Sequence, residues 1–289
     1  MIKKNTFIFV FFLNFLSQIN AQGELMVYPK RITFDGIKNR VQVVNLGNTS
    51  KDTVTYRLSH KEIKMDKYGK FSTIEQPEDN QFFASPYLRY YPRTITLAPS
   101  EWQRVKIQLI KSSELKEGEY RSHLYFQPIA KSKLLQNHTT TMKTLKTKEK
   151  SVVAIKALIG ISIANIITVG PSNTAVTLSN LTLLPPNVLA LDINRSGNQS
   201  VYGELNVNHI SLEGIRTNIA EIRGYAVYTP GNLRKTKIKL KTDVSVDYTN
   251  GKLQVTYTTP NQVDTYDEAF LNLSASEEYS LETIAIDTE

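Results

Sequence analysis

The chain has 289 residues, a formal net charge of +8 and no cysteine. The lack of cysteine excludes disulfides, lipidation at a cysteine and thiol catalysis, so stability must come from an apolar core. The positive charge would suit nucleic acid or anionic lipid. However, the lysines are scattered through alternating strands without interleaved aromatic residues, which indicates solvated strand faces instead.

Residues 1–21 have the pattern of a cleavable secretory signal. Lys3 and Lys4 precede an apolar segment at residues 7–15, and the small residue Ala21 precedes the expected cut. The apolar segment is about half as long as a bilayer-spanning helix requires, which disfavours an uncleaved anchor. We therefore expect an exported protein whose mature chain begins near Gln22.

Strand patterns dominate the rest of the chain. Val105, Ile107 and Leu109 alternate with polar residues, and no long segment keeps a 3.6-residue period. Residues 243–258 predict a β-hairpin, because two alternating runs flank Asn250-Gly251. Short strands with turn signals roughly every ten residues predict an all-β protein built from β-sandwiches.

A boundary between two sandwiches is predicted at residues 168–173, where Gly170-Pro171 interrupts the strand pattern. We expect one sandwich over residues 24–167 and a second over residues 173–289. The first contains a long basic loop at residues 130–150, and loops longer than about 15 residues are usually functional or disordered.

The most apolar part of the mature chain is residues 151–167, which read SVVAIKALIGISIANII. Its odd-numbered positions from 153 to 163 are all apolar, which predicts a strand rather than a helix. A transmembrane helix is disfavoured because Lys156, Ser162 and Asn165 would lie in or near the hydrocarbon. The apolar face of this strand must be covered either by the protein's own core or by a partner's core.

Catalytic motifs are not found. The four histidines, His60, His123, His138 and His209, lie on separate predicted elements without metal-ligand spacing. The sequence contains no GxSxG, HExxH or phosphate-binding glycine loop. We therefore expect no enzyme activity, no cofactor and no metal.

Four local patterns, in this order, resemble the PapD-like periplasmic chaperones of pilus assembly. They are residues 28–36 (YPKRITFDG), residues 92–107 with their LAP turn, residues 118–126 (GEYRSHLYF), and the basic loop followed by the apolar strand. The resemblance covers about residues 25–167. It implies two immunoglobulin-like sandwiches in an L-shaped arrangement and a periplasmic location.

The resemblance also implies partners and a mechanism. The partners would be pilus or fimbrial subunits and an outer-membrane usher. Nucleic acid binding and stable membrane insertion are not expected. A homodimer is possible when no client is bound. A subunit lacks its last strand, and the chaperone lends one to complete it before delivery to the surface fibre. The expected donor residues are Val153, Ile155, Ala157 and Ile159, whereas Ile161 and Ile163 should lie in the chaperone's own core.

The family anchors the subunit's terminal carboxylate with two basic residues between the domains. By alignment of residues 34–36, Arg31 matches the first of them. The second is a lysine near the end of the donor strand, where this chain has Ser162. Lys156, the only lysine in the strand, is the candidate for the second anchor, and Arg93 or Lys106 are alternatives to it.

A competing interpretation is a structural pilin or adhesin-like surface protein built of two sandwiches. A pilin usually offers a free donor segment at its mature N-terminus. Here residues 22–26 are short and the apolar strand is internal, which favours the chaperone. A carbohydrate-binding module could use Trp102, but a single tryptophan beside a strand is more often part of a core.

Overall fold

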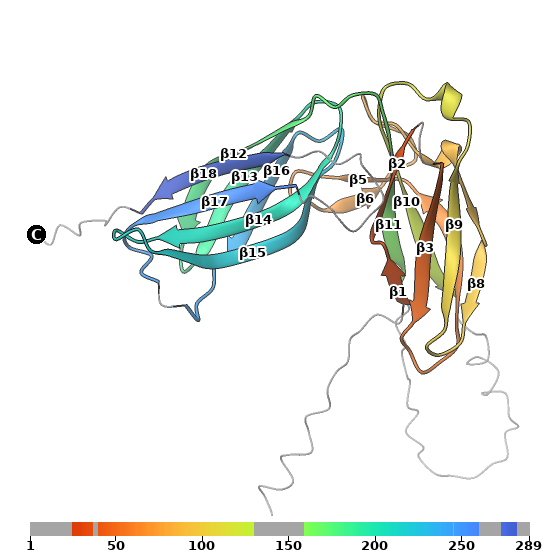
Figure 1. Cartoon of the computed structure of the whole chain (residues 1–289), viewed down its shortest axis with the longest axis horizontal. Helices are drawn as coiled ribbons and strands as arrows, with labels where there is room; N and C mark the ends of the chain where they lie inside the picture. The colour runs from red at the N-terminus through yellow and green to blue at the C-terminus, as the bar shows by residue number, and fades with distance from the viewer. Residues whose placement is uncertain (1–24, 37–39, 130–158, 245, 260–272, 282–289) are drawn as a thin grey trace, which may run out of the picture.

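The computed structural model describes residues 25–36, 40–129, 159–244, 246–259 and 273–281. The predicted signal peptide, the basic loop, Lys156 and the donor positions Val153, Ile155 and Ala157 lie outside the described residues. Strands dominate the described part, where the helical elements are two short 3-10 turns, Ser85–Tyr87 and Ser112–Glu114. Figure 1 shows two β-sandwiches set at a steep angle to each other, so the predicted fold class is confirmed.

The first sandwich consists of two sheets. One has the strand order β1 (Leu25–Tyr28), β3 (Val41–Asn48), β9 (Trp102–Leu109) and β7 (Leu88–Tyr91). The other has the order β2 (Arg31–Asp35), β11 (Ile161–Val169), β10 (Gly118–Ile129), β4 (Val54–Lys61) and β8 (Thr94–Leu97). The chain therefore changes sheet between β1 and β2. The β2–β11 pairing is parallel, and all other pairings in these two sheets are antiparallel.

The second sandwich contains one three-stranded and one four-stranded sheet. The first has the order β12 (Ala175–Leu184), β13 (Val188–Ser196) and β16 (Leu233–Lys239). The second has the order β15 (Arg216–Val227), β14 (Val201–Ile210), β17 (Lys252–Thr258) and β18 (Ser274–Ser280). Burial alternates at every residue of β14, as expected for a strand with one face on the core.

Each sandwich has its own core. Phe34, Phe126 and Ile107 are fully buried in the first, and Tyr257, Leu189 and Leu191 are buried in the second. The alternating run in β9 is buried at Val105, Ile107 and Leu109, as its pattern predicts. These cores stabilise the chain without disulfides, since it has no cysteine.

The predicted hairpin over residues 243–258 is only half correct. Leu253, Val255 and Tyr257 lie in β17, but residues 244 and 246–248 are not in a strand. The edges of β17 are occupied by β14 and β18 instead. Val244 and Val246 still pack against the second core, which explains their apolar character without a ladder.

The Asn250-Gly251 turn is not the type I′ turn that this pair favours, because Gly251 has a positive φ but Asn250 does not. Gly251 has a φ of +84°, and a Cβ added there would lie 2.4 Å from the carbonyl oxygen of Ile210. Gly214 has a similar φ of +83° but no atom within 4 Å of an added Cβ. Gly251→Ala should therefore destabilise the protein by about 2–4 kcal/mol, against about 1 kcal/mol for Gly214→Ala. Urea denaturation would measure both, and equal losses would show that the contact with Ile210 is harmless.

Two features join the sandwiches. Ala164 and Ile166 of β11 pack against Ala226 and Tyr228 of the second sandwich. A short hairpin, β5 (Ile63–Met65) and β6 (Phe71–Thr73), also extends from the first sandwich towards the second (Figure 1). The backbone N–H of Lys235 donates to the carbonyl of Lys67 in this hairpin at 2.6 Å.

A buried carboxylate reinforces this joint. Glu119, which is 4% exposed, accepts hydrogen bonds from the backbone N–H of Ser200 at 2.6 Å and from the Thr229 hydroxyl at 2.9 Å. The Ser200 hydroxyl donates to the same carboxylate. One side chain of the first sandwich thus satisfies three donors of the second, which fixes the two relative to each other.

Candidate functional site: a basic cleft between the sandwiches

Arg31 lies where the two sandwiches meet. On β2, Ile32 and Phe34 point into the first core, so Arg31 projects from the opposite face of the sheet. It stands opposite Ala164 of β11. The Nε and Nη1 atoms of Arg31 are buried and have no hydrogen-bond partner.

A second arginine, Arg121, projects from the same face of the sheet. It lies on β10 opposite Ile166 and is 4% exposed. Its Nη1 donates to the carbonyl of Ile63 at 3.3 Å and its Nη2 to the carbonyl of Thr229 at 3.1 Å, while Nε has no partner. Burial lowers the pKa of Arg121, and the nearby charge of Arg31 lowers it further.

The positive charges in this cleft are not balanced by ion pairs. In the described part of the chain, no carboxylate lies within ion-pair distance of Arg31 or Arg121. The carboxylates that act on Arg121 from farther away, Glu119 and Glu62, accept hydrogen bonds from Ser200, Thr229 and Ser122. A buried unpaired charge is costly, and an incoming anion would relieve that cost.

Aromatic rings from the second sandwich line the other side of the cleft. The guanidinium carbon of Arg31 lies 4.9 Å from the ring centroid of Tyr202 and 5.6 Å from that of Tyr228. The guanidinium carbon of Arg121 lies 4.4 Å from the Tyr228 ring. Both arginines therefore meet aromatic faces, whereas their unpartnered N–H groups remain available.

Two histidines, of which His123 is buried and His60 is half-buried, make the first sandwich sensitive to acid. Burial lowers the pKa of His60 to about 4, and burial together with Arg121 and Arg31 lowers the pKa of His123 to about 3. An unfolded histidine has a pKa of about 6.5. Below that pH the unfolded chain binds protons that the folded chain does not, so stability is complete above pH 6.5 and falls as the pH drops towards 4.

We predict a loss of about 1 kcal/mol for each histidine between pH 6 and pH 5. Urea denaturation at pH 7, 6 and 5 would measure it. The double variant His60→Gln/His123→Gln should show a flatter dependence over the same range. Identical slopes for the variant and the natural chain would contradict the assignment.

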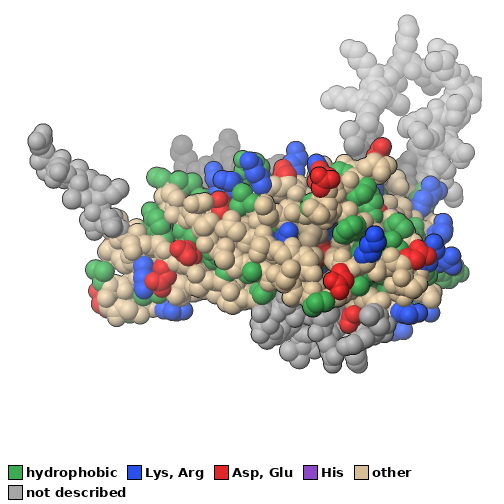
Figure 2. Space-filling view, turned by 90° about the horizontal axis from the view of Figure 1, so that it is seen from above, with side chains coloured by type: hydrophobic (Ala, Val, Ile, Leu, Met, Phe, Trp, Pro, Cys, Tyr) green, Lys and Arg blue, Asp and Glu red, His purple; other side chains and the backbone are tan. Residues whose placement is uncertain are grey.

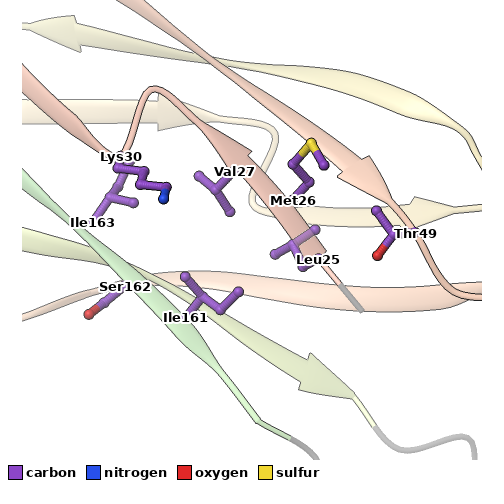
Figure 3. A pocket seen from close by; sticks show the side chains of 8 residues that line it. All are labelled: Leu25, Met26, Val27, Lys30, Thr49, Ile161, Ser162 and Ile163. Carbon is purple, nitrogen blue, oxygen red and sulfur yellow. The ribbon is translucent and has the colours of Figure 1, made fainter. Parts of the chain in front are cut away.

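An open strand edge leads to the cleft. β2 pairs with β11 only from Ala164 onwards, and β11 pairs on its other side with β10. Within the described residues, the edge of β11 at Ile161–Ile163 therefore has no strand beside it. A groove of about 430 Å³ adjoins this edge, and Figure 3 shows side chains of β1 and β11 facing it. Its lining includes Leu25, Val27, Ile161 and Ile163.

The described site residues that were predicted from the sequence lie in different parts of the first sandwich. Ile163 is buried in the first core and Ile161 packs against it, as predicted. Ile159 is 76% exposed and precedes β11. Arg93 precedes β8, at the edge of the sheet farthest from β2, and Lys106 lies exposed on β9 of the other sheet. The structure brings neither of them to Arg31.

Sequence reasoning missed Arg121, His123, Tyr202 and Tyr228. One signal for Arg121 and His123 was available: both occupy positions of the same parity in the GEYRSHLYF strand, whose other parity is Tyr120, Leu124 and Phe126. The two tyrosines come from the other sandwich, and no local pattern connects them to Arg31.

Outside the cleft, the surface carries both positive and negative side chains. On the face seen in Figure 2, basic and acidic side chains are interspersed over both sandwiches. Among the described residues, no cluster of three or more histidine, aspartate or glutamate side chains could hold a metal ion. The same residues include no helix that is long and apolar enough to span a membrane.

A scan against protein families and a search of curated proteins both find no match. Solved structures are similar over most of their length. A chaperone–tip adhesin complex of CFA/I fimbriae is 12% identical, with 89% of this chain and 97% of that chain covered and a TM-score of 0.41. The CupB2 chaperone of Pseudomonas aeruginosa is 11% identical, with 89% and 100% covered and a TM-score of 0.42.

A third similar structure is the Salmonella enterica SafA pilin in complex with the SafB chaperone. It is 10% identical, with 90% of this chain and 97% of that chain covered and a TM-score of 0.39. The names of all three structures include a chaperone.

Proposed function

We propose that the protein is a periplasmic chaperone that binds pilus or fimbrial subunits by donor-strand complementation and delivers them for assembly into a surface fibre. The observation that carries this proposal is the pair of guanidinium groups of Arg31 and Arg121 at the end of an open strand edge, both of which bury N–H groups that have no acceptor. A strand that ends in a free carboxylate fits both features.

The geometry of β2 suggests where such a strand would end. β2 begins at Arg31, opposite Ala164, and occupies the edge of β11 from there on. A client strand added to the free edge at Ile161–Ile163 would run into the start of β2. Its terminal carboxylate would then lie close to Arg31, where the unpartnered N–H groups can donate to it.

Arg121 is proposed as the second anchor. It shares a sheet face and the Tyr228 ring with Arg31, and its Nε donor is free. A serine at position 162, where the family has a basic residue, is then no obstacle to carboxylate binding. Ahead of the described edge, Val153, Ile155, Ala157 and Ile159 remain the proposed donor residues, with main-chain hydrogen bonds supplying affinity and alternate side chains supplying specificity.

The absence of catalytic motifs supports a binding role rather than an enzymatic one. We propose that the chain acts after export to the periplasm, and that the bound subunit passes to an outer-membrane usher. The apolar groove beside β11 supports a client contact that continues from the strand edge onto side chains of β1.

The test is co-expression of the full chain with a pilus or fimbrial subunit from the same organism. We expect a one-to-one complex by size-exclusion chromatography, and protection of the subunit from periplasmic proteolysis. Ladders formed by the chain on its own would instead support the structural pilin or adhesin.

A further inference from the structure

We propose that Tyr202 and Tyr228 of the second sandwich are positioning residues for carboxylate binding. Their rings contact the flat faces of the Arg31 and Arg121 guanidinium groups and orient them. A carboxylate ordinarily has this role for a buried arginine. This inference rests on the proposed function and adds a role for the second sandwich. The anion site is then composite, and the first sandwich alone does not complete it.

The two tyrosines belong to one face of the second sandwich. Tyr202 of β14 pairs with Ala226 of β15, and Tyr228 lies two residues beyond Ala226 on the same side. Ala226 and Tyr228 pack on Ala164 and Ile166, so this face is the one that docks on β11. Docking therefore carries both rings to the arginines.

The contacts are those of cation–π pairs. Tyr228 is 8% exposed and serves both arginines, with guanidinium carbons 5.6 Å and 4.4 Å from its ring centroid. Tyr202 adds a ring 4.9 Å from the guanidinium carbon of Arg31. All three distances fall within the range of about 6 Å in which the ring quadrupole attracts a cation.

An aromatic ring orients a guanidinium group differently from a carboxylate. A carboxylate accepts hydrogen bonds from the N–H groups and neutralises the positive charge. It would therefore compete with the client's carboxylate for the N–H groups and for the charge. A ring attracts the face of the guanidinium and leaves its N–H edge unused. This agrees with the observed pattern, in which Nε and Nη1 of Arg31 and Nε of Arg121 are buried without acceptors.

The experiment uses the full chain and a defined probe, an N-acetylated tetrapeptide with a free terminal carboxylate, with its C-terminal amide as the control ligand. Titrations would follow the Nε–Hε resonances of the arginines by NMR. The variants are Tyr202→Phe, Tyr202→Leu, Tyr228→Phe and Tyr228→Leu, together with 3,4,5-trifluorophenylalanine at position 228, which keeps the ring but weakens its negative face.

The Phe variants should bind the carboxylate peptide as the natural chain does, because the ring is retained. Each Leu variant should bind it about threefold to tenfold more weakly, and the fluorinated ring should also weaken it. Binding of the amide peptide should not change. The fluorinated variant keeps the packing volume at position 228, so it remains decisive if Tyr228→Leu disturbs the fold.

The outcomes separate the two proposals. If the natural chain does not prefer the carboxylate over the amide, carboxylate anchoring fails and the positioning role fails with it. If the natural chain prefers the carboxylate but the Leu and fluorinated variants keep the same preference, the tyrosines are only packing residues. The proposed function would then stand without them.

Discussion

Replacement of Arg31 by alanine should weaken binding of the client subunit by about 10-fold to 150-fold and leave the chaperone folded. A charge-assisted arginine–carboxylate contact contributes roughly 1.5–3 kcal/mol, which corresponds to that range. The stability of the free chain should stay the same or rise, because Arg31 buries Nε and Nη1 without partners. A loss of binding with no loss of stability is the expected signature.

Co-purification of a co-expressed subunit and urea denaturation of the free chaperone would measure the two quantities. Arg89→Ala is a matched control, since Arg89 is exposed on β7 of the other sheet. Arg31→Lys should recover only part of the affinity, because lysine keeps the charge but cannot make the bidentate contact. Ile155→Asp should also abolish recovery if the donor strand binds the client. Normal subunit yields from both Arg31→Ala and Ile155→Asp would rule out donor-strand complementation.

The strand content of this chain could be predicted because a period of two reports directly on burial. Val105, Ile107 and Leu109 in β9, and Ile161 and Ile163 in β11, lie on the core side as their alternation predicts. Burial follows a pattern of neighbouring residues, whereas the pairing of two strands depends on segments far apart in the sequence. The Asn250-Gly251 pair does lie in a turn, but Asn250 lacks the positive φ of a type I′ hairpin, and the preceding residues do not pair with β17, because β14 and β18 occupy its edges.

The candidate site was only partly predictable for a related reason. Arg31 was identified through its neighbours in the motif at residues 28–36. Arg121 has the pattern of a solvent-facing charge in a strand, but it is 4% exposed and donates to the carbonyls of Ile63 in β5 and Thr229 of the second sandwich. A residue that becomes functional through contact between two domains has no periodic signal in either domain.

Glu119→Ala should weaken the contact between the two sandwiches enough that they unfold independently. Its carboxylate accepts three hydrogen bonds from Ser200 and Thr229, and its removal leaves these donors unsatisfied in a buried joint. The negative charge that favours the charged forms of Arg121 and Arg195 is lost as well. Removal of one partner from a buried charged network costs about 3–5 kcal/mol. We expect urea denaturation to change from a single transition to two, one for each sandwich.

Trp102 fluorescence would report on the first sandwich and circular dichroism on both. Glu117→Ala is the matched control, because it removes the same charge two residues earlier from an exposed side chain. Small-angle X-ray scattering should show a wider range of interdomain angles for Glu119→Ala only. One transition with an unchanged midpoint would mean that the contacts of Ala164 and Ile166 with Ala226 and Tyr228 hold the joint without Glu119.

The same variant also links the joint to the anion site. Loss of the Glu119 charge alone would strengthen the attraction of Arg121 for an anion, because a nearby negative charge is removed. Loss of docking would have the opposite effect, since Tyr202 and Tyr228 reach the arginines only from the docked second sandwich. Weaker binding of the carboxylate peptide by Glu119→Ala would therefore have to arise from undocking, and stronger binding would show that the sandwiches stay docked and that only the charge effect remains.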